Sequence, residues 1–184
     1  MGTGLYIAGG ILLALFLFVV GIYNGFVKLR NQVGEAFSTM DVYLKRRYDL
    51  IPNLVETVKG YAAHERDTLE QVVQARNMAV NAGNLEERSK GDTMLTGTLK
   101  SLFALSESYP ALKADGAFIN LQNQLAEVEK DILQSRKYYN GVVRAMNTRV
   151  ETFPANLFAK TMGFGRVPFF MVDESERENV QISF

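Results

Sequence analysis

The chain contains no cysteine and only one histidine, His64, among its 184 residues. The lack of cysteine excludes a disulfide framework, a thiolate nucleophile and a thiolate metal site. It does not place the chain on either side of a membrane. His64 could bind a metal ion together with Glu65 or Asp67, but a zinc site needs three or four ligands. We interpret His64 as a surface or helix-end residue and expect no metal site.

The chain also lacks an excess of either charge, because 20 Lys and Arg residues balance 20 Asp and Glu residues. A neutral chain has no overall positive field to attract nucleic acid, so no nucleic-acid partner is predicted. The nucleophile motif G-x-S-x-G and the phosphate-binding motif G-x-x-x-x-G-K-[ST] are both missing. The sequence therefore predicts no cofactor and no enzyme activity.

One long run has no charged residue at all: LYIAGGILLALFLFVVGIY, from Leu5 to Tyr23. About 20 apolar residues are needed to cross the hydrocarbon core of a bilayer. The alternative is a secretory signal peptide, which has a basic start, a shorter apolar core and a small-residue cleavage site. None of these features is seen. We therefore predict an uncleaved transmembrane anchor over residues 1–23.

Basic residues flank this run on one side only. Lys28, Arg30 and the group at 45–47 follow it, and no Lys or Arg precedes it. The positive-inside rule then predicts a single-pass protein with its N-terminus outside and its C-terminal domain in the cytoplasm. Long domains can cross a membrane regardless of flanking charge, so the opposite orientation stays open.

A regular apolar seam continues beyond the anchor with alternating spacings of four and three residues. It comprises Ile22, Phe26, Leu29, Val33, Ala36, Met40 and Tyr43. A period of 3.5 residues is typical of helices that pack at a shallow angle. Ile22, Phe26, Leu29, Val33 and Met40 are therefore candidate residues for an oligomer or membrane seam. The alternative is that the same seam packs inside the chain's own bundle.

The remaining pattern predicts an all-α fold. No proline or Gly/Ser-rich linker interrupts residues 5–50, which are expected to form one helix, and Pro52 should kink or break it at residues 49–51. Further helices are expected over about 52–81, 85–108 and 118–146, with a short one over 155–162 closed by Gly163. The fold class is a transmembrane helix continuous with a long-helix antiparallel bundle of about four helices plus a short C-terminal helix. The bundle should cover residues 24–171.

Four polar residues lie around the expected kink: Arg46, Arg47, Asp49 and Asn53. A proline leaves backbone carbonyl groups without donors, and these side chains could supply them. The alternative is a polar patch that contacts a partner or lipid headgroups. On the last long helix, charged residues that include Glu129 and Arg136 are expected to form a solvated face.

The C-terminal region has two apolar features. Phe164, Phe169, Phe170 and Met171 surround Pro168, and they could cap the bundle end or touch the bilayer interface. The tail, residues 172–184, is expected to be extended or disordered. Its alternating Val180, Ile182 and Phe184 resemble a short strand that could dock on a partner or a neighbouring subunit.

Several stretches together resemble the LemA family of bacterial membrane proteins. They are YNGFVKLRNQV after the anchor, DVYLKRRYDLIPNLVETVKGYAAHE around Pro52, FINLQNQLAEVEKDILQSRKYYNGVVRAMN, and TFPANLFAKTMGF. The resemblance covers nearly the whole chain after the anchor. It implies a membrane helix that carries an antiparallel bundle in the bacterial cell (inner) membrane, with no established reaction. The family includes a magnetosome protein, which associates the fold with membrane organisation. The family often has tryptophan where Phe37 stands; an aromatic residue is kept.

These observations support three hypotheses of different classes. The first is a membrane-anchored protein that contacts lipid, self-associates as a homo-oligomer and organises membrane or membrane-protein assemblies. The second is a regulatory adaptor that binds a membrane protease or sensor kinase through its C-terminal tail. The third is an enzyme, which no arrangement of nucleophile and base in the sequence supports.

Overall fold

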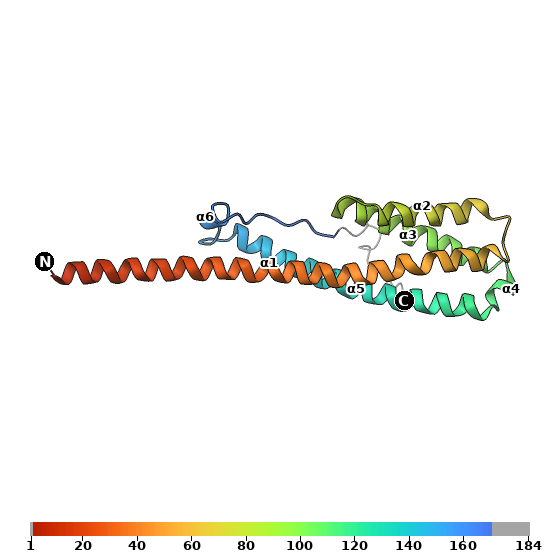
Figure 1. Cartoon of the computed structure of the whole chain (residues 1–184), viewed down its shortest axis with the longest axis horizontal. Helices are drawn as coiled ribbons and strands as arrows, with labels where there is room; N and C mark the ends of the chain where they lie inside the picture. The colour runs from red at the N-terminus through yellow and green to blue at the C-terminus, as the bar shows by residue number, and fades with distance from the viewer. Residues whose placement is uncertain (1, 171–184) are drawn as a thin grey trace, which may run out of the picture. The chain divides into compact units, whose positions relative to one another are not determined.

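The computed structural model describes residues 2–170, and within them every regular element is a helix (Figure 1). This confirms the all-α fold class. The helices are α1 (Gly2–Lys59), α2 (Arg66–Val80), α3 (Leu85–Ser106), α4 (Pro110–Lys113), α5 (Gly116–Glu151) and α6 (Asn156–Ala159). Four of these helices are long and α6 is short, as expected, whereas the four-residue α4 is an additional helix.

The described chain divides into two compact units, each formed by two separate stretches. Unit 1 comprises residues 2–38 and 138–169, and unit 2 comprises residues 39–137 and 170. Helices α1 and α5 each contribute residues to both units. The predicted domain limits at residues 23 and 171 concern the membrane and the tail, and they stay predictions.

Unit 2 is an antiparallel bundle of four helical segments. The end of α1, then α2, α3 and the first part of α5 run in alternating directions (Figure 1). Its core is mainly aliphatic and includes Met40, Leu44, Ile51, Leu54, Val72, Leu95, Leu102, Leu125, Val128 and Ile132, with Phe118 and Phe170 also buried. Gly91 on α3 lets α2 approach closely, because a Cβ there would lie 2.7 Å from the backbone of Ala79.

Helix α1 continues through Pro52 to Lys59, so of the two expected alternatives at residues 49–51 the break is wrong, and the kink stays a prediction. Pro52 has no N–H to donate to the carbonyl oxygen of Tyr48, four residues earlier. The Nε of Arg76 on α2 donates to that oxygen instead, at 3.3 Å. The donor comes from a neighbouring helix, so none of the four expected polar residues is needed for it.

The expected helix over residues 52–81 is also wrong, because the chain reverses direction between Gly60 and Glu65. Ala62 is buried in this turn, and its N–H donates to the carbonyl oxygen of Val58 at 2.8 Å. Helix α2 then begins at Arg66. The expected helix from residue 85 is confirmed, although α3 ends at Ser106, before Pro110 opens the short α4.

Unit 1 joins the first part of α1 to the last turns of α5 and to α6. Its core includes a cluster of Ile22, Phe26, Met146, Ala159 and Phe164. Helix α6 is shorter than the expected 155–162. It ends in turns that lead to Gly163, whose φ of 76° is left-handed, and the N–H of Phe164 donates to the carbonyl oxygen of Ala159 at 2.9 Å.

A strap over residues 164–168 returns along α5. The side-chain amide of Asn147 donates to the carbonyl oxygen of Val167 at 2.9 Å and accepts from its N–H at 2.8 Å. The hydroxyl of Tyr139 donates to the carbonyl oxygen of Pro168 at 3.0 Å. These bonds satisfy a backbone that has no helical partners.

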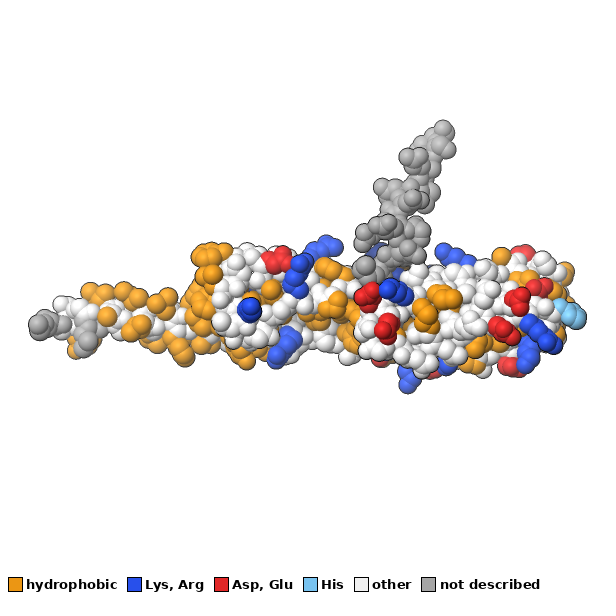
Figure 2. Space-filling view, turned by 90° about the horizontal axis from the view of Figure 1, so that it is seen from above, with side chains coloured by type: hydrophobic (Ala, Val, Ile, Leu, Met, Phe, Trp, Pro, Cys, Tyr) orange, Lys and Arg blue, Asp and Glu red, His pale blue; other side chains and the backbone are white. Residues whose placement is uncertain are grey.

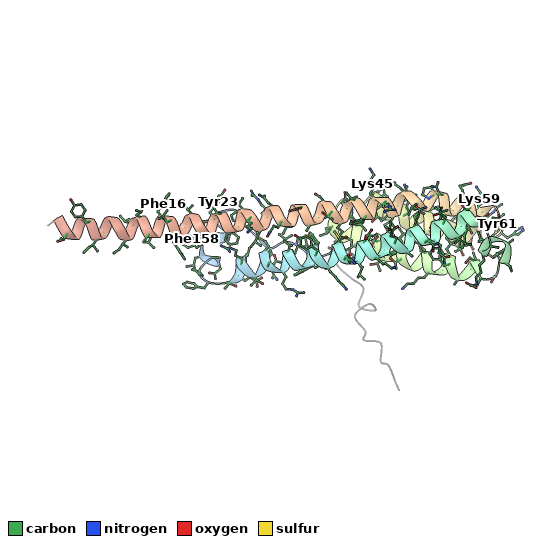
Figure 3. All side chains as sticks on the ribbon, turned by 90° about the horizontal axis from the view of Figure 1, so that it is seen from below. Phe16, Tyr23, Lys45, Lys59, Tyr61 and Phe158 are labelled. Atoms are coloured by element: carbon green, nitrogen blue, oxygen red, sulfur yellow. The ribbon has the colours of Figure 1, made fainter. Side chains whose placement is uncertain are left out.

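The first part of α1 is long and apolar enough to cross a membrane, by length and composition. Its side chains are exposed, including those of Ile7, Ile11, Leu12, Leu13, Phe16 and Leu17. In Figure 2 this stretch is covered by hydrophobic side chains, and Lys and Arg side chains follow only where other segments of unit 1 lie beside it. Figure 3 shows Phe16 on the part of α1 that has no helix next to it.

Candidate functional site

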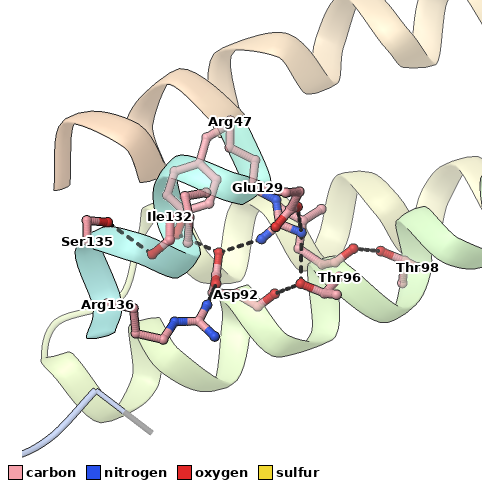
Figure 4. A network of polar contacts seen from close by, with 10 residues as sticks. Arg47, Asp92, Thr96, Thr98, Glu129, Ile132, Ser135 and Arg136 are labelled. Atoms are coloured by element: carbon pink, nitrogen blue, oxygen red, sulfur yellow. Dashed lines mark hydrogen bonds and ion pairs between the residues drawn. The ribbon is translucent and has the colours of Figure 1, made fainter. Parts of the chain in front are cut away.

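A buried network of charged side chains connects three helices of unit 2 (Figure 4). At its centre is Asp92 on α3, whose side chain is 1% exposed. Its Oδ1 lies 2.9 Å from Nη1 of Arg47 on α1, and its Oδ2 lies 2.9 Å from Nη2 of Arg136 on α5. One carboxylate therefore binds two guanidinium groups from two different helices.

Three further groups complete the network: a second carboxylate, a hydroxyl group and an aromatic ring. Nη2 of Arg47, a side chain with no exposed surface, lies 2.8 Å from Oε1 of Glu129 and 2.8 Å from Oγ1 of Thr96. The guanidinium of Arg136 also lies over the ring of Phe170, 5.1 Å from its centroid. Two arginines thus face two carboxylates, which is the arrangement that makes burial of charge tolerable.

The electrostatics of the network favour a structural role over proton transfer. Burial raises the pKa of the Tyr48 hydroxyl, and the nearby carboxylate of Asp92 raises it further. The hydroxyl oxygen of Tyr48 lies 3.5 Å from Oδ1 of Asp92 and stays protonated at neutral pH. Since Asp92 is enclosed by donors and screened from solvent, its arrangement is suited to fixing α1, α3 and α5 in register.

The four residues predicted around Pro52 do not form one patch. Arg47 points into the bundle, whereas Arg46, Asp49 and Asn53 are exposed. Arg46 lies 3.9 Å from Glu127, also exposed. Arg136, expected on a solvated face, is largely buried in the network, and Glu129, 40% exposed, joins the network from its partly solvated side. One sequence signal could have revealed the network: Arg47 stands at an apolar position between Leu44 and Ile51.

Residues of the predicted α1 seam pack against other residues of the same chain. Ile22 and Phe26 are buried in unit 1, and Met40 is buried in unit 2. Leu29 and Val33 are half-buried and pack against the core of unit 1. This burial corresponds to the alternative that the seam serves the chain's own bundle. Self-association through these residues stays a prediction.

The aromatic residues near the C-terminus pack onto the units. Phe164 stacks on Phe26 with ring centroids 4.8 Å apart, and Phe170 is buried under Arg136, while Phe169 is partly exposed. Whether these residues cap the bundle end or touch the bilayer interface stays a prediction. Met171 and the predicted docking residues Val180, Ile182 and Phe184 lie outside the described residues.

The remaining candidate, His64, is exposed in the turn between α1 and α2. Within residues 2–170, no group of three or more His, Cys, Asp or Glu side chains could hold a metal ion. The absence of a cofactor and of an enzyme activity stays a prediction.

The chain is similar in sequence to one protein family and to several individual proteins. A model of the LemA family matches residues 36–184. The chain is 27% identical to Protein LemA from Metamycoplasma hominis over 177 residues, which are 93% of this chain and 79% of that protein. It is 26% identical to Magnetosome protein MamQ 1 from Paramagnetospirillum magneticum and 24% identical to Magnetosome protein MamQ from Magnetospirillum gryphiswaldense. Each match covers 80% of this chain and 64% of the relative's own length.

Proposed function

The chain belongs to the LemA family, and from this we propose that it is a non-enzymatic, membrane-anchored bundle protein that self-associates and organises membrane or membrane-protein assemblies in the bacterial cell envelope. The observation that carries the proposal is the charge-free stretch of α1 from Leu5 to Tyr23, in which the side chains of residues 6–18 are exposed. In water such a surface would be unfavourable, whereas in lipid it is the expected surface of an anchor.

Two further observations support the proposal. The charged network of unit 2 is centred on the buried Arg47 and Asp92 and is mutually neutralised, which supports a role in the fold. Some relatives carry names that assign them to the magnetosome. We place this chain in the bacterial inner membrane as a single-pass protein with its N-terminus outside and its C-terminal units in the cytoplasm, following the basic residues after the anchor.

The mass of the assembly tests self-association directly. The full-length protein would be extracted in native lipid nanoparticles, and its copy number measured by mass and by electron microscopy. We expect several copies per particle over a wide range of protein concentration. A single copy per particle at every concentration would rule out self-association and leave the adaptor hypothesis, with residues 180–184 as the partner-binding tail.

A matched pair of variants locates the contact between copies. Gly9 and Gly10 lie on the exposed stretch of α1, with nothing within 4 Å of either Cβ position. Small residues allow membrane helices to approach closely. The double variant G9L/G10L should lower the copy number if the anchors meet there, whereas G4L, outside the charge-free run, should not change it.

A further inference from the structure

A groove of about 810 Å³ lies between α1 and the last turns of α5 in unit 1. The α1 side is apolar and is formed by Phe18, Ile22 and Leu29. The opposite side carries Arg144 and Arg149 together with Thr148 and Thr152, and residues 153–155 also line the groove. No carboxylate is among the residues that line it. The groove therefore combines an apolar wall with a positive one.

Arg149 is the unusual member of this lining. Its guanidinium lies 5.4 Å from the centroid of the Phe26 ring and directly over Gly25, where a Cβ would collide with it. Its Nε is buried without a hydrogen-bond partner, and within residues 2–170 no carboxylate forms an ion pair with it. A partly buried charge without a counter-ion is costly. Its position suits an anionic ligand.

The groove lies beside the apolar stretch of α1. Phe18 and Ile22 line it and also belong to the charge-free run that we propose to cross the membrane. Phe153, which lines the groove, is 75% exposed, and nearby Leu157 is 62% exposed. If the run spans the bilayer, the groove is at the boundary between acyl chains and headgroups, because Lys28 is the first charged residue after it.

The charge of unit 1 favours an anionic occupant. Its basic residues are Lys28, Arg30, Arg144, Arg149, Lys160 and Arg166, against only two carboxylates, Glu35 and Glu151. Basic pockets near a membrane surface bind anionic lipid headgroups. The volume of the groove is also within the range of pockets that hold a small-molecule ligand.

We propose that this groove binds one anionic phospholipid from the surrounding leaflet. An acyl chain lies against Phe18 and Ile22, and the phosphate pairs with Arg149, with Arg144 at the outer edge. The inference rests on the proposed membrane anchor. A lipid fits better than a soluble anion because Phe18 and Ile22 of the groove belong to the charge-free run of α1, and the α1 side of the groove is apolar.

The absence of tryptophan from the chain makes a direct optical test possible. F153W would place the only tryptophan at the groove of the full-length protein, in phosphatidylcholine vesicles with a minor fraction of phosphatidylglycerol. Two parallel samples carry bromine on the acyl chains of either phosphatidylglycerol or phosphatidylcholine. Quenching of the tryptophan fluorescence is compared at equal mole fraction of the brominated lipid. We expect brominated phosphatidylglycerol to be about fivefold enriched at Phe153→Trp over brominated phosphatidylcholine. Equal quenching by the two lipids would overturn the proposal.

Variants in the F153W background test the role of Arg149. R149Q should abolish the preference for phosphatidylglycerol, and R149K should keep most of it. R166Q is the matched control, because Arg166 lies outside the groove and is already paired with Glu151 at 3.0 Å. If R149Q and R166Q reduce the preference equally, general surface charge explains it, and the assigned site is wrong.

G25A gives an independent test that leaves Arg149 in the sequence. The added methyl group must push the guanidinium aside, which is easy because it is the free end of a flexible side chain. The preference should fall as in R149Q while the helical circular dichroism and thermal midpoint are retained. If G25A keeps the full preference for phosphatidylglycerol, the place of the Arg149 guanidinium does not determine lipid binding, and the proposed site is wrong.

A second reporter separates this proposal from the proposed anchor. F16W, on the exposed part of α1, should be quenched strongly by brominated lipid of either kind. If F16W is quenched and F153W is not, the anchor stands and the lipid groove is wrong. If F16W is not quenched, the proposed function itself fails. Loss of F153W quenching only at high protein-to-lipid ratio would show that a second copy fills the groove, which also overturns the lipid assignment.

Discussion

Arg76 donates its Nε hydrogen to the backbone carbonyl oxygen of Tyr48 at 3.3 Å, and this bond joins α2 to α1. The same carbonyl would have accepted from residue 52 if that residue were not proline. A proline in a helix interior costs about 3 kcal/mol, partly through such a lost bond. The side chain of one helix therefore replaces a backbone bond of another.

The relationship between Arg76 and Pro52 should appear as coupling between mutations. R76M leaves the carbonyl oxygen of Tyr48 unpaired and should lower the free energy of unfolding by about 1–3 kcal/mol. P52A restores a backbone N–H, so R76M should cost much less in the P52A background. The measurement is denaturant unfolding of the full chain in detergent, followed by circular dichroism. Strictly additive effects would show that the Arg76 bond does not compensate for Pro52.

Adjacent arginines on α1 should differ sharply in their contribution to stability. R47M removes a fully buried partner and leaves Asp92 with one guanidinium, so it should destabilise by about 3–5 kcal/mol. R46M removes an exposed pair with Glu127 and should change stability by less than about 0.5 kcal/mol. Both variants delete one positive charge, which makes them a matched pair. Similar costs for the two would contradict the buried network.

Two glycines of α3 should respond in opposite directions to alanine. A Cβ at Gly91 would lie 2.7 Å from backbone atoms of Ala79, so G91A should push α2 from α3 and cost about 1–3 kcal/mol. Gly97 has nothing within 4 Å of its Cβ position. G97A should therefore gain helix propensity, up to about 1 kcal/mol. Thermal melting of the two variants beside the wild type checks both signs.

Asp115 should make the stability of unit 2 depend on pH in the acid range. Its Oδ1 accepts from the N–H of Phe118 at 2.9 Å, and its Oδ2 accepts from the Tyr61 hydroxyl at 2.7 Å. These bonds, that of Phe118 first, lower the pKa of Asp115. A lowered pKa stabilises the fold above the unfolded-state value, about 4, and the contribution is lost as pH falls through the folded-state value.

The comparison of wild type with D115A isolates that contribution. The difference between their free energies of unfolding should be constant above about pH 5 and should shrink below about pH 4. Y61F removes only the hydroxyl bond and should give a smaller difference with the same pH dependence. A difference that stays constant down to pH 3 would show that the carboxylate charge of Asp115 does not matter.

The fold was largely predictable because its signals are local. The charge-free run, the heptad spacing after it and the regular apolar face of α5 are each visible within one segment of sequence. The behaviour at Pro52 was not predictable in the same way, since its compensating donor, Arg76, belongs to another helix. A proline rule applied to one segment cannot include a bond that only tertiary packing provides.

The buried network was missed for a related reason. Asp92 stands three and seven residues before the buried Leu95 and Leu99, on the apolar face of α3, and Arg47 holds the corresponding place on α1. A charged residue at an apolar position is a signal for a buried partner. The sequence shows the charge and position of Asp92 and Arg47. It does not show that Arg136 and Glu129 are their partners, because that pairing depends on how the helices are aligned.

The network of Arg47, Asp92, Glu129 and Arg136 also limits how this sequence can change over generations. An apolar core in its place could be equally stable, yet the route to it passes through single replacements that leave a buried charge without its partner. Each such intermediate would be selected against before the next replacement arose. The four positions are therefore expected to be inherited together, and a descendant that loses one should carry a nearby second change that restores neutrality.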